Sequence, residues 1–361
     1  MKLLHVVGAR PNFPKLAPVY RAAEQGGLEQ CVVHTGQHYD DALSASFFRD
    51  LSIRPPDVNL EVGSSSHAVQ VARIMERFEP VLEQYQPDWV AVYGDVNSTV
   101  AAALVASKLG VRVAHVEAGL RSNDRRMPEE INRIVTDRLA DLLLAPSRDA
   151  VETLRGEGEP DHEIAFVGNV MIDSLFFALP EARRIGFRES LGLERDSAVI
   201  VTLHRPSNVD DPHQLGPLLR TIEQSAGDMP LVFPVHPRTR ARLQQSQLTL
   251  DDKRWRLTEP LGYLDFLKLT AQARIVLTDS GGVQEETTVL GVPCVTLREN
   301  TERPVTISEG TNFLAGTQPA SVAEHVAKAL AAPTAGRVPR FWDGRSAERI
   351  VEILERVADV P

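Results

Sequence analysis

Residues 275–290 read IVLTDSGGVQEETTVL, and this stretch decides the fold class. Its first four residues predict a buried strand, and its last eight predict a helix. Ser280, Gly281 and Gly282 form the turn between them, where free backbone N–H groups and a hydroxyl can hold a diphosphate. Glu286 follows one helical turn later, where a carboxylate can bind the hydroxyl pair of a ribose. The stretch therefore predicts a strand–turn–helix unit of a parallel sheet, with an anion site at the carboxyl end of the strand.

Strand patterns alternate with helical patterns on both sides of this unit, as in parallel βαβ folds. The predicted strands are residues 3–7, 31–35, 89–93, 111–116, 142–145, 164–167, 198–203, 231–235, 275–278 and 294–297. The predicted helices are residues 67–85, 99–109, 129–139, 215–224, 283–290, 321–331 and 346–357. A charged segment with two glycines, 180–195, interrupts the alternation. We therefore predict two Rossmann-like domains, 1–172 and 173–340, and a C-terminal helix in 341–361 that packs on the first domain.

Composition excludes several classes of protein. The net charge of -10, without a basic stripe, argues against a nucleic-acid partner. No apolar run reaches the roughly 20 residues that a membrane helix needs, and the apolar start is too short for a signal peptide, so we expect no membrane association and a cytoplasmic location. Cys31 and Cys294 lie in apolar runs and are interpreted as buried spacers, without a disulfide or metal site. The G-x-G-x-x-G fingerprint is missing, which argues against nicotinamide chemistry.

Cationic residues follow the predicted strands of both halves. Arg10 and Lys15 in GARPNFPK can place a guanidinium and an ammonium over a helix N-terminus, although an exposed turn explains the same pattern. In the second half, His204 is followed by Arg205 in LHRPSN, and His236 with Arg238 repeats this combination of histidine and arginine. A core histidine is the alternative for His204. In a chain this acidic, the repeated pairing of histidine and arginine favours phosphate contact.

Acidic residues gather at the strand ends of the first half. Asp95 in YGDVNST and Glu117 in HVEAGLRS each end a strand pattern, and Glu129 and Glu130 open a helix in MPEEINR. A helix cap or a favourable interaction with the helix dipole accounts for one or two of these acids. Three acidic motifs at one sheet edge favour proton transfer instead, because close carboxylates separate each other's pKa values as a general acid and base require.

The ordered motifs GxRPxxxK, GD, HVEAGLR, PEExNR, HR, SGGxQEE and TERP resemble those of the non-hydrolysing UDP-N-acetylglucosamine 2-epimerases over nearly the whole chain. The resemblance implies a GT-B-like α/β architecture, with two Rossmann-like domains whose parallel sheets face each other across a central cleft. It also implies a homodimer that interconverts UDP-N-acetylglucosamine and UDP-N-acetylmannosamine, with a UDP-sugar as its ligand and no cofactor.

The same resemblance assigns roles to residues that match the family's motifs. It implies catalytic roles for Asp95, Glu117, Glu129 and His204. Substrate contacts, with uridine at Leu261 and Phe266 and ribose at Glu286, are implied for Arg10, Lys15, Arg133, Leu261, Phe266, Ser280, Gly281, Gly282, Glu286 and Arg303.

Four departures from the family pattern stand beside this match. DVNST (95–99) replaces a GDTxT motif, and Val305 stands where many members have glutamate. GQHYD (36–40) replaces an AQHRE-like sequence, and the segment between Glu117 and Glu129 is short. The last two regions border a second substrate site that activates some members, so the resemblance does not carry allosteric activation over to this chain.

The C2 proton of such a sugar is not adjacent to a carbonyl, so direct abstraction faces a high barrier. Elimination of UDP removes the difficulty: the anomeric C–O bond breaks, C2–H becomes acidic, and a glycal forms that recombines with UDP after protonation on the opposite face. Inversion then needs acids on both faces, which fits Asp95 with Glu117 or Glu129. We expect His204→Ala to cut turnover severely without unfolding the protein.

Several other functions remain compatible with the same motifs. A hydrolysing 2-epimerase would release UDP and N-acetylmannosamine, and a GT-B glycosyltransferase would use the same diphosphate site with an acceptor. A further epimerase would act on a UDP-diacetamido-uronic acid. The non-enzymatic alternative is a UDP-sugar sensor that binds its ligand without turnover.

Overall fold

The computed structural model describes residues 1–37, 50–245, 250–332 and 338–358. The chain divides into two compact units: unit 1 is Met1–Phe177 with Arg340–Pro361, and unit 2 is Ala178–Pro339. The division falls inside α7 (Val170–Arg184), the helix that also contains the boundary predicted at 172/173.

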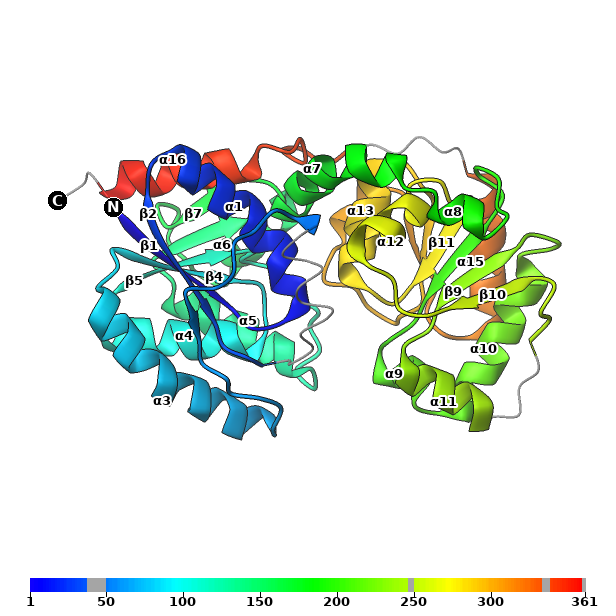
Figure 1. The fold of residues 1–361 in the computed structure, drawn as a ribbon, viewed down its shortest axis with the longest axis horizontal. Helices are drawn as coiled ribbons and strands as arrows, with labels where there is room; N and C mark the ends of the chain where they lie inside the picture. Colours follow the sequence, from blue (N-terminus) through cyan, green and yellow to red (C-terminus); the bar gives the residue numbers. More distant parts are fainter. Residues whose placement is uncertain (38–49, 246–249, 333–337, 359–361) are drawn as a thin grey trace. The chain divides into compact units, whose positions relative to one another are not determined.

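Unit 1 contains a seven-stranded parallel sheet in the order β3-β2-β1-β4-β5-β6-β7 (Figure 1). Its strands are β1 (Lys2–Val7), β2 (Glu29–His34), β3 (Val58–Asn59), β4 (Trp89–Tyr93), β5 (Arg112–Val116), β6 (Leu142–Ala145) and β7 (Ile164–Phe166). The order reverses at β1, which pairs with β2 on one side and with β4 on the other. In a doubly wound sheet, ligands bind beyond the carboxyl ends of the strands at such a reversal. Arg10 comes shortly after β1, and Asp95 comes shortly after β4.

Helices cover both faces of this sheet (Figure 1). One face carries α1 (Phe13–Gln25) and α16 (Ser346–Ala358), which pack against each other. The other carries α3 (His67–Tyr85), α4 (Asn97–Lys108) and α5 (Pro128–Leu139), with α6 (Arg148–Gly156) near the end of the sheet. An apolar cluster of unit 1 joins the second set of helices to the sheet through buried residues such as Leu4, Val90, Ile74, Phe78 and Ala102. Burial on both faces explains why most residues of the central strands are apolar.

Unit 2 contains a six-stranded parallel sheet in the order β10-β9-β8-β11-β12-β13. Its strands are β8 (Val199–Thr202), β9 (Leu231–Pro234), β10 (Trp255–Thr258), β11 (Ile275–Thr278), β12 (Cys294–Thr296) and β13 (Asn312–Leu314). Here the order reverses between β8 and β11, so His204 and Ser280 follow the two central strands. The edge strands β10 and β13 were not predicted, because they are short and lack a continuous apolar run.

The helices of unit 2 again lie on both faces of their sheet. One face carries α10 (Pro212–Ser225) and α15 (Pro319–Ala331), which pack together over buried Leu215, Leu219 and Val322. The other carries α8 (Phe187–Ser190), α12 (Tyr263–Thr270) and α13 (Gly281–Leu290) around a second apolar cluster. The short helices α9 (Pro206–Val209), α11 (Pro237–Gln245) and α14 (Val305–Ser308) complete the unit. Two Rossmann-like units with parallel sheets confirm the predicted GT-B-like α/β class.

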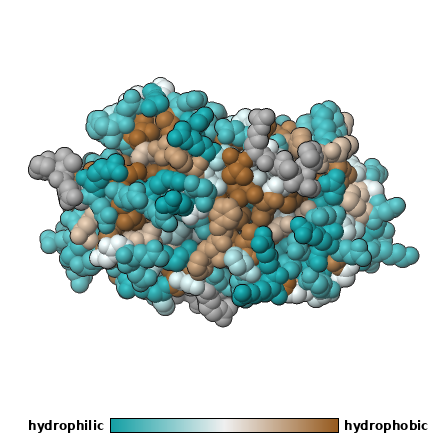
Figure 2. Space-filling model, turned by 90° about the horizontal axis from the view of Figure 1, so that it is seen from above, coloured by the Kyte–Doolittle hydropathy of each residue, from teal (hydrophilic) through white to brown (hydrophobic). Residues whose placement is uncertain are grey.

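The face shown in Figure 2 exposes many hydrophilic residues, and hydrophobic residues also form continuous areas on it. Within the described part of the chain, no helix is long and apolar enough to cross a membrane. Cys31 and Cys294 are both buried and unbridged, as expected for spacers in strands β2 and β12.

Candidate active site

The loops after β1 and β4 are joined by the side chain of Asn12. Its Oδ1 accepts hydrogen bonds from the backbone N–H groups of Gly8 (3.1 Å) and Ala9 (3.0 Å), and its Nδ2 donates to the carbonyl of Tyr93 (2.8 Å). These bonds fix the short 3-10 turn, Arg10–Asn12, that carries the half-buried Arg10. Asn12 was not singled out in the sequence, because the bond to Tyr93 spans 81 residues and leaves no local pattern.

Lys15 and Glu117 form a direct, buried ion pair. Lys15 comes from the first turn of α1, and Glu117 comes directly after β5. Gly94, at the end of β4, faces this pair: a Cβ there would lie 2.5 Å from Lys15 Nζ and 3.2 Å from Glu117 Oε2. A side chain at 94 would therefore displace the pair, which explains the glycine in YGDVNST. The structure brings together a cation and an acid that the sequence predicted for different roles.

Glu117 has an unusual backbone conformation. Its φ is +79°, in the left-handed region that side-chain-bearing residues rarely adopt. Such strain persists where surrounding structure holds it, and it gathers at active sites. The backbone N–H groups of Glu117 and Ala118 both donate to the carbonyl of Leu144 (3.1 and 3.2 Å), which fixes the turn. The strain supports Glu117 as a functional residue.

Asp95, for which the resemblance implied a catalytic role, is held by Arg133, for which it implied a substrate contact. One guanidinium nitrogen of Arg133 bonds to Asp95 Oδ2, and the other lies 2.7 Å from Glu130 Oε2. Asp95 keeps a quarter of its side chain exposed, whereas Arg133 and Glu130 are buried. Asn132 also donates to the backbone carbonyl of Asp95 (2.8 Å). The acid is therefore oriented by α5 while part of it stays accessible.

The two glutamates that open α5 differ in role. Glu130 accepts hydrogen bonds from the backbone of Ser122 (2.9 Å) and Asn123 (2.8 Å), and it pairs with Arg133. Burial raises the pKa of Glu130, but these hydrogen bonds outweigh it and lower the pKa below its usual value. Glu130 therefore holds the 122–123 loop, while Glu129, half-buried in the same first turn, does not share this pairing.

A buried network holds the loops that carry Asp95 and Glu117. His115 Nδ1 lies 2.6 Å from Asp137, and its Nε2 lies 2.8 Å from the carbonyl oxygen of Gly94. Asp137 also pairs with Arg121 (2.7 Å) and accepts from Gly119 N (3.2 Å). Burial raises the pKa of Asp137, but His115 and Arg121 lower it overall, so Asp137 is a carboxylate. His115 thus links the carboxylate of Asp137 to the backbone of the Gly94 loop.

We expect Asp137→Asn to destabilise unit 1 by about 3–5 kcal/mol, since the buried guanidinium of Arg121 loses its buried carboxylate partner. Activity should fall as well, because the Gly94 and Gly119 loops lose their common anchor. Urea unfolding and turnover measure the two effects. Glu157→Gln is the matched control: it removes the outer ion pair of Arg121, whose acid is one-third exposed, and should cost less than about 1 kcal/mol. Equal losses in the two variants would contradict the role of Asp137.

In unit 2, His204 lies beside a buried acid that sequence reasoning did not select. Its Nδ1 is 2.8 Å from Asp279 Oδ1, and 56% of its side chain is exposed. Asp279 is fully buried, and its carboxylate also accepts from the backbone of His204 and Arg205 and from Asn208 Nδ2 (2.9 Å). Burial raises the pKa of Asp279, but these bonds lower it overall. Asp279 belongs to the TDSGG motif quoted above. An acidic residue directly after a predicted strand was the feature of the sequence that could have indicated it.

The turn from β11 to α13 has the predicted form of an anion site. Ser280 is the N-cap residue of α13 and does not cap it with its side chain, and Gly281 and Gly282 form the first turn. The guanidinium of Arg303 covers Gly281 so closely that a Cβ there would lie 2.5 Å from Nη1. Glu285 holds Arg303 Nε at 2.9 Å. Helix N–H groups and an arginine therefore meet at one place, which suits a phosphate group.

Glu286, one turn further along α13, is buried and accepts a hydrogen bond from the hydroxyl of Tyr263 (2.9 Å). Burial raises its pKa to about 7, and Glu285 adds to the rise. Leu261 and Phe266 are half-buried beside the apolar cluster that supports α12 and α13. The structure thus gathers three of the predicted nucleotide contacts around the first turns of these two helices.

The raised pKa of Glu286 makes stability depend on pH. A carboxylic acid whose pKa is higher in the folded state stabilises that state at low pH, and this contribution is lost as pH rises from 4.5 to about 7. Between pH 6 and 8 the free energy of unfolding of the wild type should fall by about 1 kcal/mol, and that of Glu286→Gln should not show this fall. Urea unfolding at the two pH values measures the difference.

Two other groups define the control. Burial raises the pKa of Asp173 to about 6, so its contribution to stability is lost mainly below pH 6. Asp173→Asn should therefore change the difference in unfolding free energy between pH 6 and pH 8 less than Glu286→Gln does. Burial lowers the pKa of His5 to about 4, so its contribution is lost as pH falls from 6.5, in the opposite direction. An unchanged pH dependence in Glu286→Gln would contradict the assignment.

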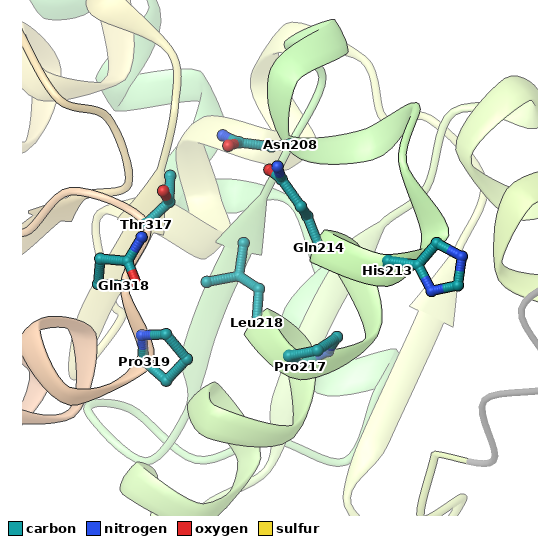
Figure 3. A pocket seen from close by; sticks show the side chains of 8 residues that line it. All are labelled: Asn208, His213, Gln214, Pro217, Leu218, Thr317, Gln318 and Pro319. Atoms are coloured by element: carbon teal, nitrogen blue, oxygen red, sulfur yellow. The ribbon is translucent and has the colours of Figure 1, made fainter.

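Unit 2 also contains a pocket of about 190 Å³ between α10 and the start of α15 (Figure 3). Its lining residues are Asn208, His213, Gln214, Pro217, Leu218, Thr317, Gln318 and Pro319. In Figure 3 the amide of Gln214 points toward Asn208, the residue that also donates to Asp279. None of the residues predicted for the active site lines this pocket.

The GQHYD segment (36–40), which departs from the family pattern, is described only in part. Gly36 and Gln37 belong to the described residues, and the other three lie outside them. Among residues 1–37, 50–245, 250–332 and 338–358, no group of three or more His, Cys, Asp or Glu side chains is placed to hold a metal ion.

Comparison with known proteins gives consistent matches. A family model described as UDP-N-acetylglucosamine 2-epimerase matches residues 21–355. The chain is 41% identical to the UDP-N-acetylglucosamine 2-epimerase of Methanocaldococcus jannaschii, over 98% of this chain and 99% of that protein. It is 40% identical to the UDP-2,3-diacetamido-2,3-dideoxy-D-glucuronate 2-epimerase of Pseudomonas aeruginosa, over 99% and 100%. The crystal structure of the M. jannaschii UDP-GlcNAc 2-epimerase in complex with UDP-GlcNAc and UDP is similar with a TM-score of 0.91 at 41% identity, covering 99% and 100% of the two chains.

Proposed function

This chain belongs to the UDP-N-acetylglucosamine 2-epimerase family, a family of isomerases, and we propose that it interconverts UDP-N-acetylglucosamine and UDP-N-acetylmannosamine. The observation that carries the proposal is the combination of two sites. Unit 1 holds buried and half-buried acids at the ends of β4 and β5, and unit 2 holds an anion site at the N-terminus of α13.

Unit 2 supplies the groups that would bind UDP. The N–H groups of Gly281 and Gly282, the hydroxyl of Ser280 and the guanidinium of Arg303 suit the diphosphate. Glu286 can accept hydrogen bonds from ribose hydroxyls, and the ring of Phe266 with the backbone of Leu261 would contact uracil. His204 would stabilise negative charge on the phosphate oxygen that leaves C1.

Unit 1 supplies the groups that would act at the sugar. Asp95 and Glu117, with Glu129, are the candidates for proton transfer at C2. Arg133 orients Asp95 by its hydrogen bond, and Lys15 contacts Glu117 directly. Arg10 would contact the substrate from the turn after β1. The strained backbone of Glu117 supports its place among the acids.

The reaction would proceed by elimination and re-addition. The C1–O bond breaks with its electron pair on the phosphate oxygen, and a carboxylate removes the C2 proton, which leaves a glycal and UDP. A second acid then protonates C2 on the opposite face, and the same phosphate oxygen re-forms the bond to C1. Atoms and charge balance without a redox partner, and water is not consumed, so UDP is not released as a product.

A second candidate substrate is a UDP-diacetamido-uronic acid. The similarity to the P. aeruginosa 2-epimerase of that sugar supports it at nearly the same identity as the M. jannaschii enzyme. The two nucleotides differ at C3 and C6, whereas the reaction at C2 is the same. Parallel assays with both substrates separate the candidates through kcat/KM. A homodimer completes the proposal and is tested by sedimentation velocity.

Proton NMR of UDP-N-acetylglucosamine with the purified protein in D₂O, without added cofactor, tests the reaction. The expected result is UDP-N-acetylmannosamine with deuterium at C2 of the sugar. Free UDP and N-acetylmannosamine would identify a hydrolysing enzyme instead. Confirmed binding with an unchanged spectrum for both nucleotides would sink the proposed activity.

A further inference from the structure

Asp279 makes an unusually complete set of hydrogen bonds for a single buried carboxylate. Both oxygens accept from the backbone N–H of His204 at 3.1 Å, and one accepts from Arg205 N at 3.0 Å and from Asn208 Nδ2 at 2.9 Å. Its remaining partner is the imidazole Nδ1 of His204 at 2.8 Å. The backbone and the ring of one residue are thus held by the same acid, which lies on the neighbouring strand end.

The chemistry of these partners fixes the state of the imidazole. A carboxylate can only accept hydrogen bonds, so Nδ1 of His204 must carry hydrogen. In the neutral ring the other nitrogen, Nε2, then holds the lone pair. Nδ1 faces the fully buried Asp279, whereas more than half of the His204 side chain is exposed, so Nε2 is the nitrogen available to a ligand.

We propose that Asp279 is a positioning residue that holds His204 in the Nδ1–H tautomer and aims Nε2 at the departing phosphate oxygen. The inference rests on the proposed function for the identity of the ligand, but its structural part does not. When Nε2 carries a proton it can donate a hydrogen bond to that oxygen, and the buried carboxylate offsets the positive charge of the ring. Asp279 itself makes and breaks no covalent bond.

Asn208 extends the same arrangement. Its Nδ2 donates both to Asp279 and to the carbonyl of Leu297 (3.1 Å), so it holds the carboxylate against the end of β12. Asp279 therefore cannot rotate away from His204 without breaking bonds to three other groups. This is the rigidity expected of a residue that fixes a catalytic histidine.

The first test uses the wild-type protein. The ¹⁵N spectrum of the ten histidines at pH 8.5, where an ordinary histidine is neutral, assigns His204 by comparison with His204→Ala. The expected signal is a protonated Nδ1 and an unprotonated Nε2. The opposite tautomer would overturn the proposal, whatever sugar nucleotide the enzyme uses.

The second test is kinetic and uses Asp279→Asn, which keeps the shape of the side chain. We expect kcat to fall about 100-fold with KM changed less than about threefold, and the His204 tautomer to become mixed. In the His204→Ala background the same change should cause no further loss, because a positioning residue acts through its partner. An equal loss in that background would show a merely structural role. A kcat within threefold of wild type would overturn the proposal, and failure of the wild type to turn over UDP-N-acetylglucosamine would refute only the proposed substrate.

Discussion

Replacement of Glu117 by glutamine is expected to lower kcat for 2-epimerisation about 1,000-fold, because general acid–base groups contribute roughly 100- to 10,000-fold. Glutamine keeps the size of the side chain but cannot take up a proton from C2. The site that would bind UDP lies in unit 2, so the Kd of UDP by calorimetry should change little. Turnover and C2 deuterium incorporation by NMR measure the catalytic loss.

Lys15 sets the control for this variant. Glu117→Gln leaves its buried ammonium without the carboxylate, so part of any loss could reflect a displaced loop. The double variant Lys15→Met, Glu117→Gln removes both charges and should unfold at a urea concentration closer to wild type while remaining inactive. Comparison with Glu129→Gln, starting from each epimer, shows which acid serves which face. Activity within tenfold of wild type in Glu117→Gln would remove Glu117 from proton transfer.

Strand and helix positions were predictable where hydrophobic patterning is local. The strands β1, β4, β8 and β11 are buried on both faces, so their sequences are apolar runs, interrupted in β1 only by the buried His5, that end at glycine or polar residues. The edge strand β10 escaped prediction because its exposed positions break such a run. Doubly wound sheets place the strand ends together, which is why motifs far apart in the chain could be assigned to common edges.

Side-chain partners within the site were much less predictable. Glu117 and Asp95 were selected because acids at strand ends are unusual, but the contact of Lys15 with Glu117 joins positions about 100 residues apart. Asp137 and Asp279 were missed although each orients a histidine. Each is a buried carboxylate whose partner lies far away in the sequence, and the periodicity of a single sequence does not indicate such pairs. Arg133 pairs with Glu130 and not with Glu129. Both glutamates are within reach along the helix, and the choice depends on which face of α5 is buried against the rest of unit 1.

His204→Ala is expected to lower kcat about 100- to 1,000-fold, the usual cost of removing one donor to an oxyanion. The side chain is more than half exposed, so its loss leaves no cavity and the fold should remain intact. Asp279 loses one partner but keeps its bonds to Arg205 and Asn208. Circular dichroism and urea unfolding establish that the variant is folded, and NMR measures its turnover.

His213→Ala is the matched control, since His213 is an exposed histidine of the same unit that lines the separate pocket of α10. It should retain turnover within about twofold, because surface substitutions away from a site have small effects. The ratio of the two losses isolates what the Asp279-bound imidazole contributes. If His204→Ala turned over UDP-N-acetylglucosamine nearly as fast as His213→Ala, charge on the departing phosphate would have to be stabilised by Arg303 and the N-terminus of α13 alone.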